Sequence, residues 1–146
     1  MYKHDVYISF SGTDYTLDDF VHQLSNALRR KRIRAFADPK RLKSSSSSSG
    51  SEEFGAIPDA RKIEKSKIAI VVLSRKYAST AWCLDELLQI LRCRRERGQV
   101  VIPVFDGEFP VLAEERLGSC GAEFLEEARA ALEAIADLAG WNSRYW

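Results

Sequence analysis

Short apolar runs alternate with longer amphipathic segments along the chain. The apolar runs are rich in β-branched side chains, as strands are, and they cover residues 6–10, 33–36, 68–73 and 100–105. The last two runs are almost continuously apolar, which is typical of strands covered on both faces. Strand and helix patterns in alternation predict a parallel sheet between layers of helices, with right-handed crossovers.

The segments between and after these runs have helical periodicity, and they cover residues 14–31, 52–66, 80–98 and 121–138. Asp14 or Thr16 can cap the start of the first segment. Gly98 is a natural end for the third. The second is the weakest, because Gly55 and Pro58 interrupt it.

Ligands of parallel sheets bind beyond the C-terminal ends of the strands, so the loops after the four runs are the candidate sites. The loop after the second run contains six consecutive serines at 44–49. A segment of this composition cannot bury apolar surface. We therefore expect one domain over residues 1–146, with a mobile serine-rich loop at 43–51 and a short edge strand at 141–146.

Composition and charge narrow the function classes. The 146 residues are 45% hydrophobic and 29% charged, as in a globular domain that buries a core. The net charge is +1, so no overall field attracts nucleic acid or a membrane. The basic run at 92–97 most simply forms a solvated helix end that complements the helix dipole. A nucleic-acid patch there is possible but otherwise unsupported.

Cysteine usage and hydropathy indicate a compartment. The three cysteines, Cys83, Cys93 and Cys120, form no CxxC pair, which argues against a zinc site and a disulfide framework. The longest apolar run, 68–73, is far shorter than the roughly 20 residues of a membrane span. We expect no metal and no membrane contact, and a reducing compartment such as the cytoplasm.

The richest candidate chemistry lies at the start of the third helical segment. Trp82 and Glu86 are four residues apart, so both project from one face of the helix. We expect that face to differ from the leucine stripe at Leu84, Leu87, Leu88 and Leu91. An indole beside a carboxylate at the mouth of a strand-end cleft can hold a cationic aromatic ring and a sugar. The simpler alternative is that Trp82 packs in the core and Glu86 is a solvated acid.

The turn after the first strand is a weaker candidate. Phe10, Ser11 and Gly12 begin the sequence FSGTD, in which Gly12 permits a close backbone approach and the next helix start can bind phosphate. One glycine is far short of a dinucleotide-binding or Walker motif, so a plain turn with a helix cap is the simpler alternative. Neither His4 nor His22 has a partner at ligand spacing, and no nucleophile motif accompanies the serines.

Together, these segments resemble the plant-type TIR (Toll/interleukin-1 receptor/resistance) domain family. The resemblance rests on HDVYISFSGTD, FVHQLSNALRRKRIRAFAD, IEKSKIAIVVLSRKYASTAWCLDEL, GQVVIPVF and LAGW. It spans nearly the whole chain. The WCLDEL stretch after Tyr-Ala-Ser is its most specific part.

The resemblance implies an α/β, flavodoxin-like fold, in which a five-stranded parallel sheet of order 2-1-3-4-5 is flanked by helices. On this template, residues 121–138 are the fourth helix and residues 141–146 the fifth strand. A final helix normally follows, and we expect it to be missing here. The chain is then a single TIR domain whose expected protein partners are other TIR domains, through self-association.

The resemblance also implies cleavage of NAD+ or NADP+ as substrate at the nicotinamide–ribose bond, in plant innate immunity. The products are nicotinamide and ADP-ribose or cyclic ADP-ribose isomers, and no cofactor is needed. By motif position Glu86 matches the catalytic glutamate, and Glu86→Ala is expected to abolish activity with the fold intact. The expected substrate-binding residues are Phe10, Ser11, Gly12, Asp38, Thr80 and Trp82. A non-catalytic module that assembles through TIR–TIR contacts is the alternative.

Overall fold

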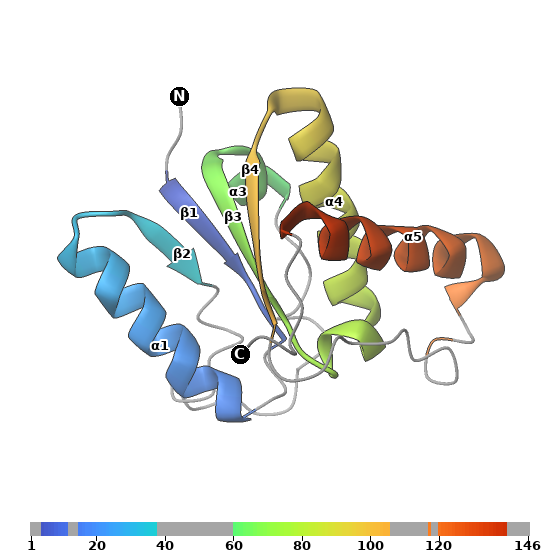
Figure 1. Cartoon of the computed structure of the whole chain (residues 1–146), viewed down its shortest axis with the longest axis horizontal. Helices are drawn as coiled ribbons and strands as arrows, with labels where there is room; N and C mark the ends of the chain where they lie inside the picture. Colours follow the sequence, from blue (N-terminus) through green and yellow to red (C-terminus); the bar gives the residue numbers. More distant parts are fainter. Residues whose placement is uncertain (1–3, 12–14, 38–59, 106–116, 118–119, 140–146) are drawn as a thin grey trace.

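The computed structural model describes residues 4–11, 15–37, 60–105, 117 and 120–139. Strands and helices alternate along them (Figure 1), as the hydrophobic pattern predicts. The elements are β1 (His4–Ser9), α1 (Tyr15–Arg30), β2 (Ala35–Ala37), α3 (Ala60–Glu64), β3 (Ser66–Leu73), the 3-10 helix η2 (Tyr77–Ser79), α4 (Ala81–Arg97), β4 (Val100–Phe105) and α5 (Ala122–Ala139).

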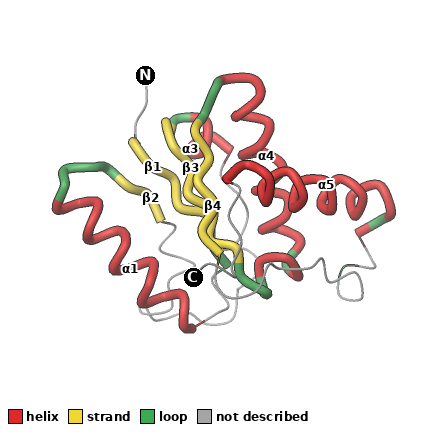
Figure 2. Tube along the Cα trace, in the orientation of Figure 1, coloured by secondary structure: helices red, strands yellow, loops and turns green. Residues whose placement is uncertain are grey.

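The four described strands form one parallel sheet in the order β2-β1-β3-β4 (Figure 2). β1 lies between two neighbours, so that Tyr7 is opposite Phe36 of β2 and Ala69 of β3. This arrangement is the 2-1-3-4 part of the predicted order, and the α/β fold class is confirmed. The predicted fifth strand at 141–146 and the serine-rich loop at 43–51 lie outside the described residues.

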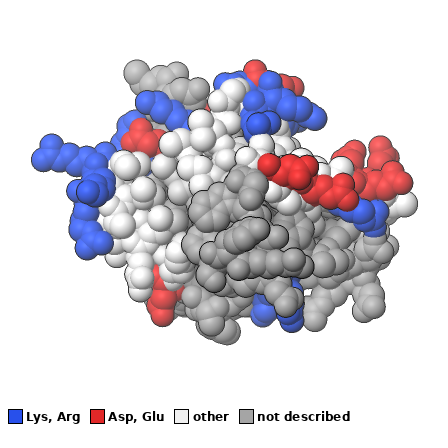
Figure 3. Space-filling view, in the orientation of Figure 1, with Lys and Arg blue, Asp and Glu red and all other residues white. Residues whose placement is uncertain are grey.

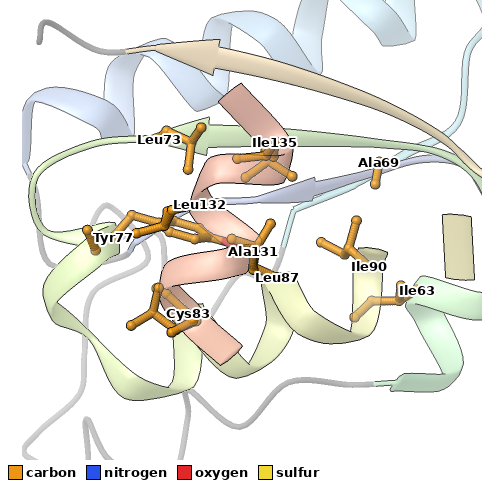
Figure 4. Packing of buried hydrophobic residues seen from close by; sticks show 14 of the residues in the cluster. Ile63, Ala69, Leu73, Tyr77, Cys83, Leu87, Ile90, Ala131, Leu132 and Ile135 are labelled. Atoms are coloured by element: carbon orange, nitrogen blue, oxygen red, sulfur yellow. The ribbon is translucent and has the colours of Figure 1, made fainter. Parts of the chain in front are cut away.

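Alternation along the strands divides the core into two layers. Even-numbered positions of β1 and β3, such as Ile8 and Ile70, pack with Val21 of α1 on one face of the sheet. Odd-numbered positions pack with α3, α4 and α5 on the other. Figure 4 shows side chains of β3, α4 and α5 gathered in this second layer, among them Leu73 and Leu87. A side chain on β1 therefore meets α4 only if its position is odd.

The hydrogen bonds at the C-terminal end of α1 determine the residue at which β2 begins. Arg32 has φ 62°, and its amide donates to the carbonyl of Arg29 at 2.9 Å. The amide of Ile33 donates to the carbonyl of Leu28, also at 2.9 Å, which completes a Schellman motif. Because Ile33 is still bonded to the helix end, β2 begins at Ala35 and not at the predicted residue 33.

The turn between α3 and β3 is tighter than the sequence pattern predicts. α3 ends at Glu64 and β3 begins at Ser66, so residue 66 belongs to the strand and not to the helix predicted over 52–66. The buried side chain of Gln99 donates from Nε2 to the carbonyls of Ile63 and Ser66, at 2.8 and 2.9 Å. These two bonds hold the turn closed.

The remaining boundaries are close to prediction, but the burial of β4 is not. α4 ends at Gly98 with φ 72°, which confirms the predicted helix stop. β4 has its predicted bounds, yet Val100 and Ile102 are 54% and 42% exposed. Both are even-numbered and lie on the α1 side of the sheet. The expectation that β4 is covered on both faces is therefore wrong for these positions.

Two further features are whether a helix could cross a membrane and how the thiols of α4 are placed. Among the described helices, none has the length and apolar character needed to cross a membrane. Cys83 and Cys93 are buried on α4 and are not in disulfides. Burial raises the pKa of the Cys93 thiol above 9.0, and the nearby Glu64 carboxylate adds to the effect.

Replacing Arg32 with glycine should stabilise the domain. A left-handed conformation costs an L-residue roughly 1–2 kcal/mol, whereas glycine loses only about 0.5–1 kcal/mol in added chain entropy. We expect the free energy of unfolding in urea to rise by roughly 0.5–1 kcal/mol. As a control, Gln23→Gly within α1 should lower it by about 1 kcal/mol. A loss of stability at position 32 would contradict this helix end.

Asp5 gives the domain one acid-sensitive contact. Its carboxylate accepts the backbone amide of Arg34 at 2.8 Å and lies 3.4 Å from that guanidinium. The backbone hydrogen bond, followed by the side-chain hydrogen bonds from Arg34, lowers the pKa of Asp5 below 3.8. The carboxylate therefore contributes stability above its unfolded pKa, and this contribution is lost as pH falls through the folded pKa.

Asp5→Asn should reduce the pH dependence of stability in acid. As pH falls below about 4, the wild type should lose melting temperature faster than the variant, because only the wild type must protonate this carboxylate. Arg34→Ala is the matched control, since it keeps the backbone hydrogen bond and should remove only part of the difference. Parallel melting curves for wild type and Asp5→Asn would refute the assignment.

Candidate functional site

The start of α4 lies at the C-terminal edge of the sheet. The chain leaves β3 at Leu73, makes the turn of η2, and enters α4 at Ala81, so that α4 runs back along the sheet (Figure 1). Thr80 precedes the helix with an extended backbone, and its Oγ1 donates to the carbonyl of Lys76 at 2.6 Å. Its hydroxyl thus stabilises the η2 turn and makes no side-chain cap of α4.

The carboxylate of Glu86 lies inside the protein, between α4 and β1. It is 0% exposed. Its Oε2 accepts a hydrogen bond from Tyr7 Oη at 2.8 Å, and its Oε1 accepts one from Ser9 Oγ at 2.5 Å. Ser9 Oγ is in turn 2.8 Å from Tyr77 Oη. All four side chains are buried, and they join three elements, β1, η2 and α4.

The odd positions of β1 explain this cluster. Tyr7 and Ser9 are two residues apart, so both face α4, whereas Val6 and Ile8 face α1. A carboxylate is costly to bury unless hydrogen-bond donors replace water, and hydrogen bonds to an ionised acceptor are among the stronger ones. The two hydroxyls therefore allow Glu86 to occupy a core position.

Proton counting fixes the direction of the chain of hydroxyls. A serine hydroxyl has one proton, and that of Ser9 goes to Glu86. The contact between Ser9 and Tyr77 is then a hydrogen bond in which Tyr77 donates. Donation runs from Tyr77 to Ser9 to Glu86, and separately from Tyr7 to Glu86.

The prediction from the sequence about the surroundings of Glu86 was wrong. Glu86 does not lie at an open cleft on a face apart from the apolar stripe, since it is buried with Cys83, Leu87 and Ile90 of the same helix. The alternative of a solvated acid is wrong as well. Trp82 is half-buried and packs against the same core layer, as the simpler alternative for that residue predicts.

Among the other predicted site residues, the structure places the side chain of Phe10 away from Glu86. Phe10 is fully buried in the layer on the α1 side of the sheet, so its side chain is on the opposite face from Glu86. Ser11 is buried and Thr80 is half-buried. Gly12 and Asp38 lie outside the described residues.

Sequence reasoning missed Tyr7, Ser9 and Tyr77. A usable signal existed, because Tyr7 and Ser9 are the hydroxyl-bearing residues at alternate positions of the otherwise apolar run 6–10. Such a pair on one strand face predicts a buried polar partner on the covering helix. Tyr77 carried no comparable signal, since its position depends on the η2 turn.

The ring of Tyr7 is held from the side of β2. Its centroid is 5.8 Å from that of Phe36, with 28° between the two planes. The Lys62 ammonium of α3 lies 3.9 Å from the centroid of the Phe36 ring, a cation–π contact. The hydroxyl that reaches Glu86 therefore belongs to a packed side chain.

Two other candidate sites gain no support. In the part of the chain that the structure describes, no three His, Cys, Asp or Glu residues are grouped to hold a metal. The basic run on α4 is interleaved with acids, since Arg92 lies 3.9 Å from Glu96 and Arg97 lies 3.9 Å from Glu64. Figure 3 shows blue and red side chains mixed at that helix end, which fits a solvated face.

Glu86→Ala should destabilise the domain, contrary to the expectation from sequence. Truncation removes the acceptor for Tyr7 and Ser9 in a buried site, which costs roughly 2–4 kcal/mol. Glu86→Gln should stay within about 1 kcal/mol of the wild type. Its Oε1 can accept from Tyr7, and its Nε2 can donate to Ser9, whose proton then turns to Tyr77. Urea denaturation of both variants measures this, and equal stability for wild type and Glu86→Ala would contradict the buried network.

Comparison with known proteins assigns the family. The family model described as TIR domain matches residues 3–144. The chain is 38% identical over 156 aligned positions to the probable disease resistance protein RPP1 of Arabidopsis thaliana, covering 99% of this chain and 12% of that protein. It is 33% identical to the disease resistance protein RPV1 of Vitis rotundifolia, covering 95% of this chain and 10% of that protein.

A solved structure agrees with this assignment. The fold is similar to the TIR domains in the structure of the activated Roq1 resistosome directly recognizing the pathogen effector XopQ, with a TM-score of 0.69 and 31% identity. That match covers 93% of this chain and 85% of the solved chain. The chain spans only about a tenth of the length of the two disease resistance proteins. From the parallel sheet, the start of α4 and these matches, we conclude that the chain belongs to the plant-type TIR domain family.

Proposed function

We propose that this chain is a signalling TIR domain of plant innate immunity that cleaves NAD+ at the nicotinamide–ribose bond, with Glu86 as its catalytic carboxylate. The observation that supports it is the buried Glu86 carboxylate next to Ser9, the last residue of β1, because ligands of parallel sheets bind beyond this end of the strands. The carboxylate already accepts two hydroxyl hydrogen bonds. The disease resistance relatives support the immune setting. The three cysteines are not in disulfides, which suits a reducing compartment, and so a cytoplasmic location.

Cleavage of the nicotinamide–ribose bond requires mainly a negative charge positioned beside the ribose. The nicotinamide of NAD+ is already a pyridinium cation, so it leaves with the electron pair of the C–N bond and requires no proton. The ribose is left as an oxocarbenium ion, which a carboxylate stabilises electrostatically. Water then adds and releases a proton to the solvent to give ADP-ribose, or a nucleophilic group of the same molecule adds, again with loss of a proton, to give a cyclic isomer. NADP+ contains the same bond.

Trp82 is a second candidate for contact with the substrate. It lies four residues before Glu86 on α4, so the two side chains project from neighbouring positions on the helix. An indole stacked on the nicotinamide ring contributes roughly 1–2 kcal/mol of cation–π attraction when desolvated. This attraction disappears as the ring departs neutral, so Trp82 serves binding more than the chemical step.

Access to Glu86 is a requirement of the proposal. Because the carboxylate is 0% exposed, NAD+ can meet it only after the surroundings of Glu86 open. We propose that self-association with other TIR domains drives this opening. The resistosome of the Roq1 protein supports the idea that relatives act as assemblies. Turnover per subunit should then rise with protein concentration.

The decisive assay is nicotinamide release from NAD+ over a range of protein concentrations, with and without a crowding agent. We expect Glu86→Gln to lower kcat on the order of 100- to 1,000-fold, because the negative charge beside the ribose is lost while the fold remains. Asp85→Asn is the matched control, since Asp85 is exposed and accepts a hydrogen bond from Gln89 Nε2, one turn further along the same helix, at 3.3 Å. It should keep wild-type activity. Wild-type activity in Glu86→Gln would remove the catalytic role of Glu86.

The second candidate is a non-catalytic module that assembles through TIR–TIR contacts. The observation that favours it is the complete burial of Glu86 with hydroxyl partners, which suits a purely structural acceptor. Sedimentation that detects self-association, together with no nicotinamide release at any concentration, would support the module and exclude the enzyme.

A further inference from the structure

We propose that Tyr7, Ser9 and Tyr77 are positioning residues that hold the Glu86 carboxylate in one orientation beside the C-terminal end of β1. The inference rests on the proposed NAD+ cleavage and extends it to β1 and η2, which carry none of the residues expected to act on the bond itself. Four buried groups and three hydrogen bonds carry it.

The first step concerns the rotation of the carboxylate. The terminal torsion of a glutamate is broad and has no sharp staggered minima, so one hydrogen bond leaves the carboxylate plane loosely defined. Here Tyr7 bonds Oε2 and Ser9 bonds Oε1, both from the same strand. Two donors on a rigid strand, one for each oxygen, fix the plane.

The second step concerns the donors themselves. The Ser9 hydroxyl can rotate, but donation from Tyr77 to Ser9 Oγ selects the rotamer whose proton points to Glu86. Consecutive hydrogen bonds also polarise one another in a site without water. Tyr77 therefore acts on the carboxylate through Ser9.

The third step concerns Tyr7. Its hydroxyl can serve as a fixed point because its ring packs on Phe36 and its backbone is paired with strands on both sides. An electrostatic catalyst depends on groups that are already oriented before the charge develops, since reorientation during the reaction would cost free energy. Misplacement of a catalytic group by about 1 Å can cost 100-fold in rate.

The experiment removes single hydroxyl groups. Tyr7→Phe and Ser9→Ala should each lower kcat about 10- to 100-fold while KM for NAD+ changes less than about threefold, because the charge remains but its orientation is lost. Tyr77→Phe should have a smaller effect, and none at all in a Ser9→Ala background. Ser9→Thr, which keeps the hydroxyl, should restore activity.

Ser66→Ala is the matched control. Ser66 is a buried strand serine like Ser9, but its hydroxyl donates to the carbonyl of Lys62 at 2.9 Å, at the opposite end of β3 from η2. Its loss should leave kcat unchanged. Equal kcat values for Ser9→Ala, Tyr7→Phe and wild type, with Glu86→Gln inactive, would overturn the inference and leave the proposed function standing.

A second readout does not depend on activity. With ¹³C-labelled glutamate side chains, the carboxyl signal of Glu86 is the one that Glu86→Gln removes. It should shift in Tyr7→Phe and Ser9→Ala and stay in place in Ser66→Ala. If the wild type releases no nicotinamide, the proposed function fails and this signal alone decides: a shift supports the orientation of Glu86 by the hydroxyls, and an unmoved signal overturns it.

Discussion

A buried carboxylate that must be hydrogen-bonded is the constraint on which the arrangement around α4 depends. Glu86 lies in the core layer between the sheet and α4, where an acid without donors would be strongly destabilising. The donors come from β1 and, one bond further away, from η2. Three features thus depend on the Glu86 carboxylate. They are the side of α4 that faces the sheet, the side chains of β1 that face α4, and the path of the chain from β3 to α4.

Much of the fold could be predicted because it follows from local patterns. The apolar runs are nearly the observed strands, and β4 was predicted with its observed bounds. Errors arose where a boundary depends on individual hydrogen bonds and not on the hydrophobic pattern. The start of β2 depends on a helix end at Arg32, and the start of β3 depends on Gln99, which belongs to a later part of the chain. Neither contact leaves a periodic signal in the sequence.

The candidate site was harder to predict than the fold. The spacing of Trp82 and Glu86 predicts a shared helix face, but it does not predict the direction of that face, because a helical pattern holds no information on which polar residue a sheet can satisfy. Only Tyr7 and Ser9, seen as a pair on one strand face, could have indicated that Glu86 turns inward. Phe10 has an even position on the same strand pattern, which puts its side chain in the other layer.

The two buried thiols of α4 have a practical consequence. Cys83 precedes Glu86 on α4 and Cys93 follows it, and both lie on the side of the helix that packs on the sheet. Neither thiol can react with a bulky reagent while that packing persists. Alkylation would therefore proceed only through excursions in which α4 separates from β1 and β3. The alkylation rate of these two thiols therefore measures how often the interior around Glu86 opens to solvent.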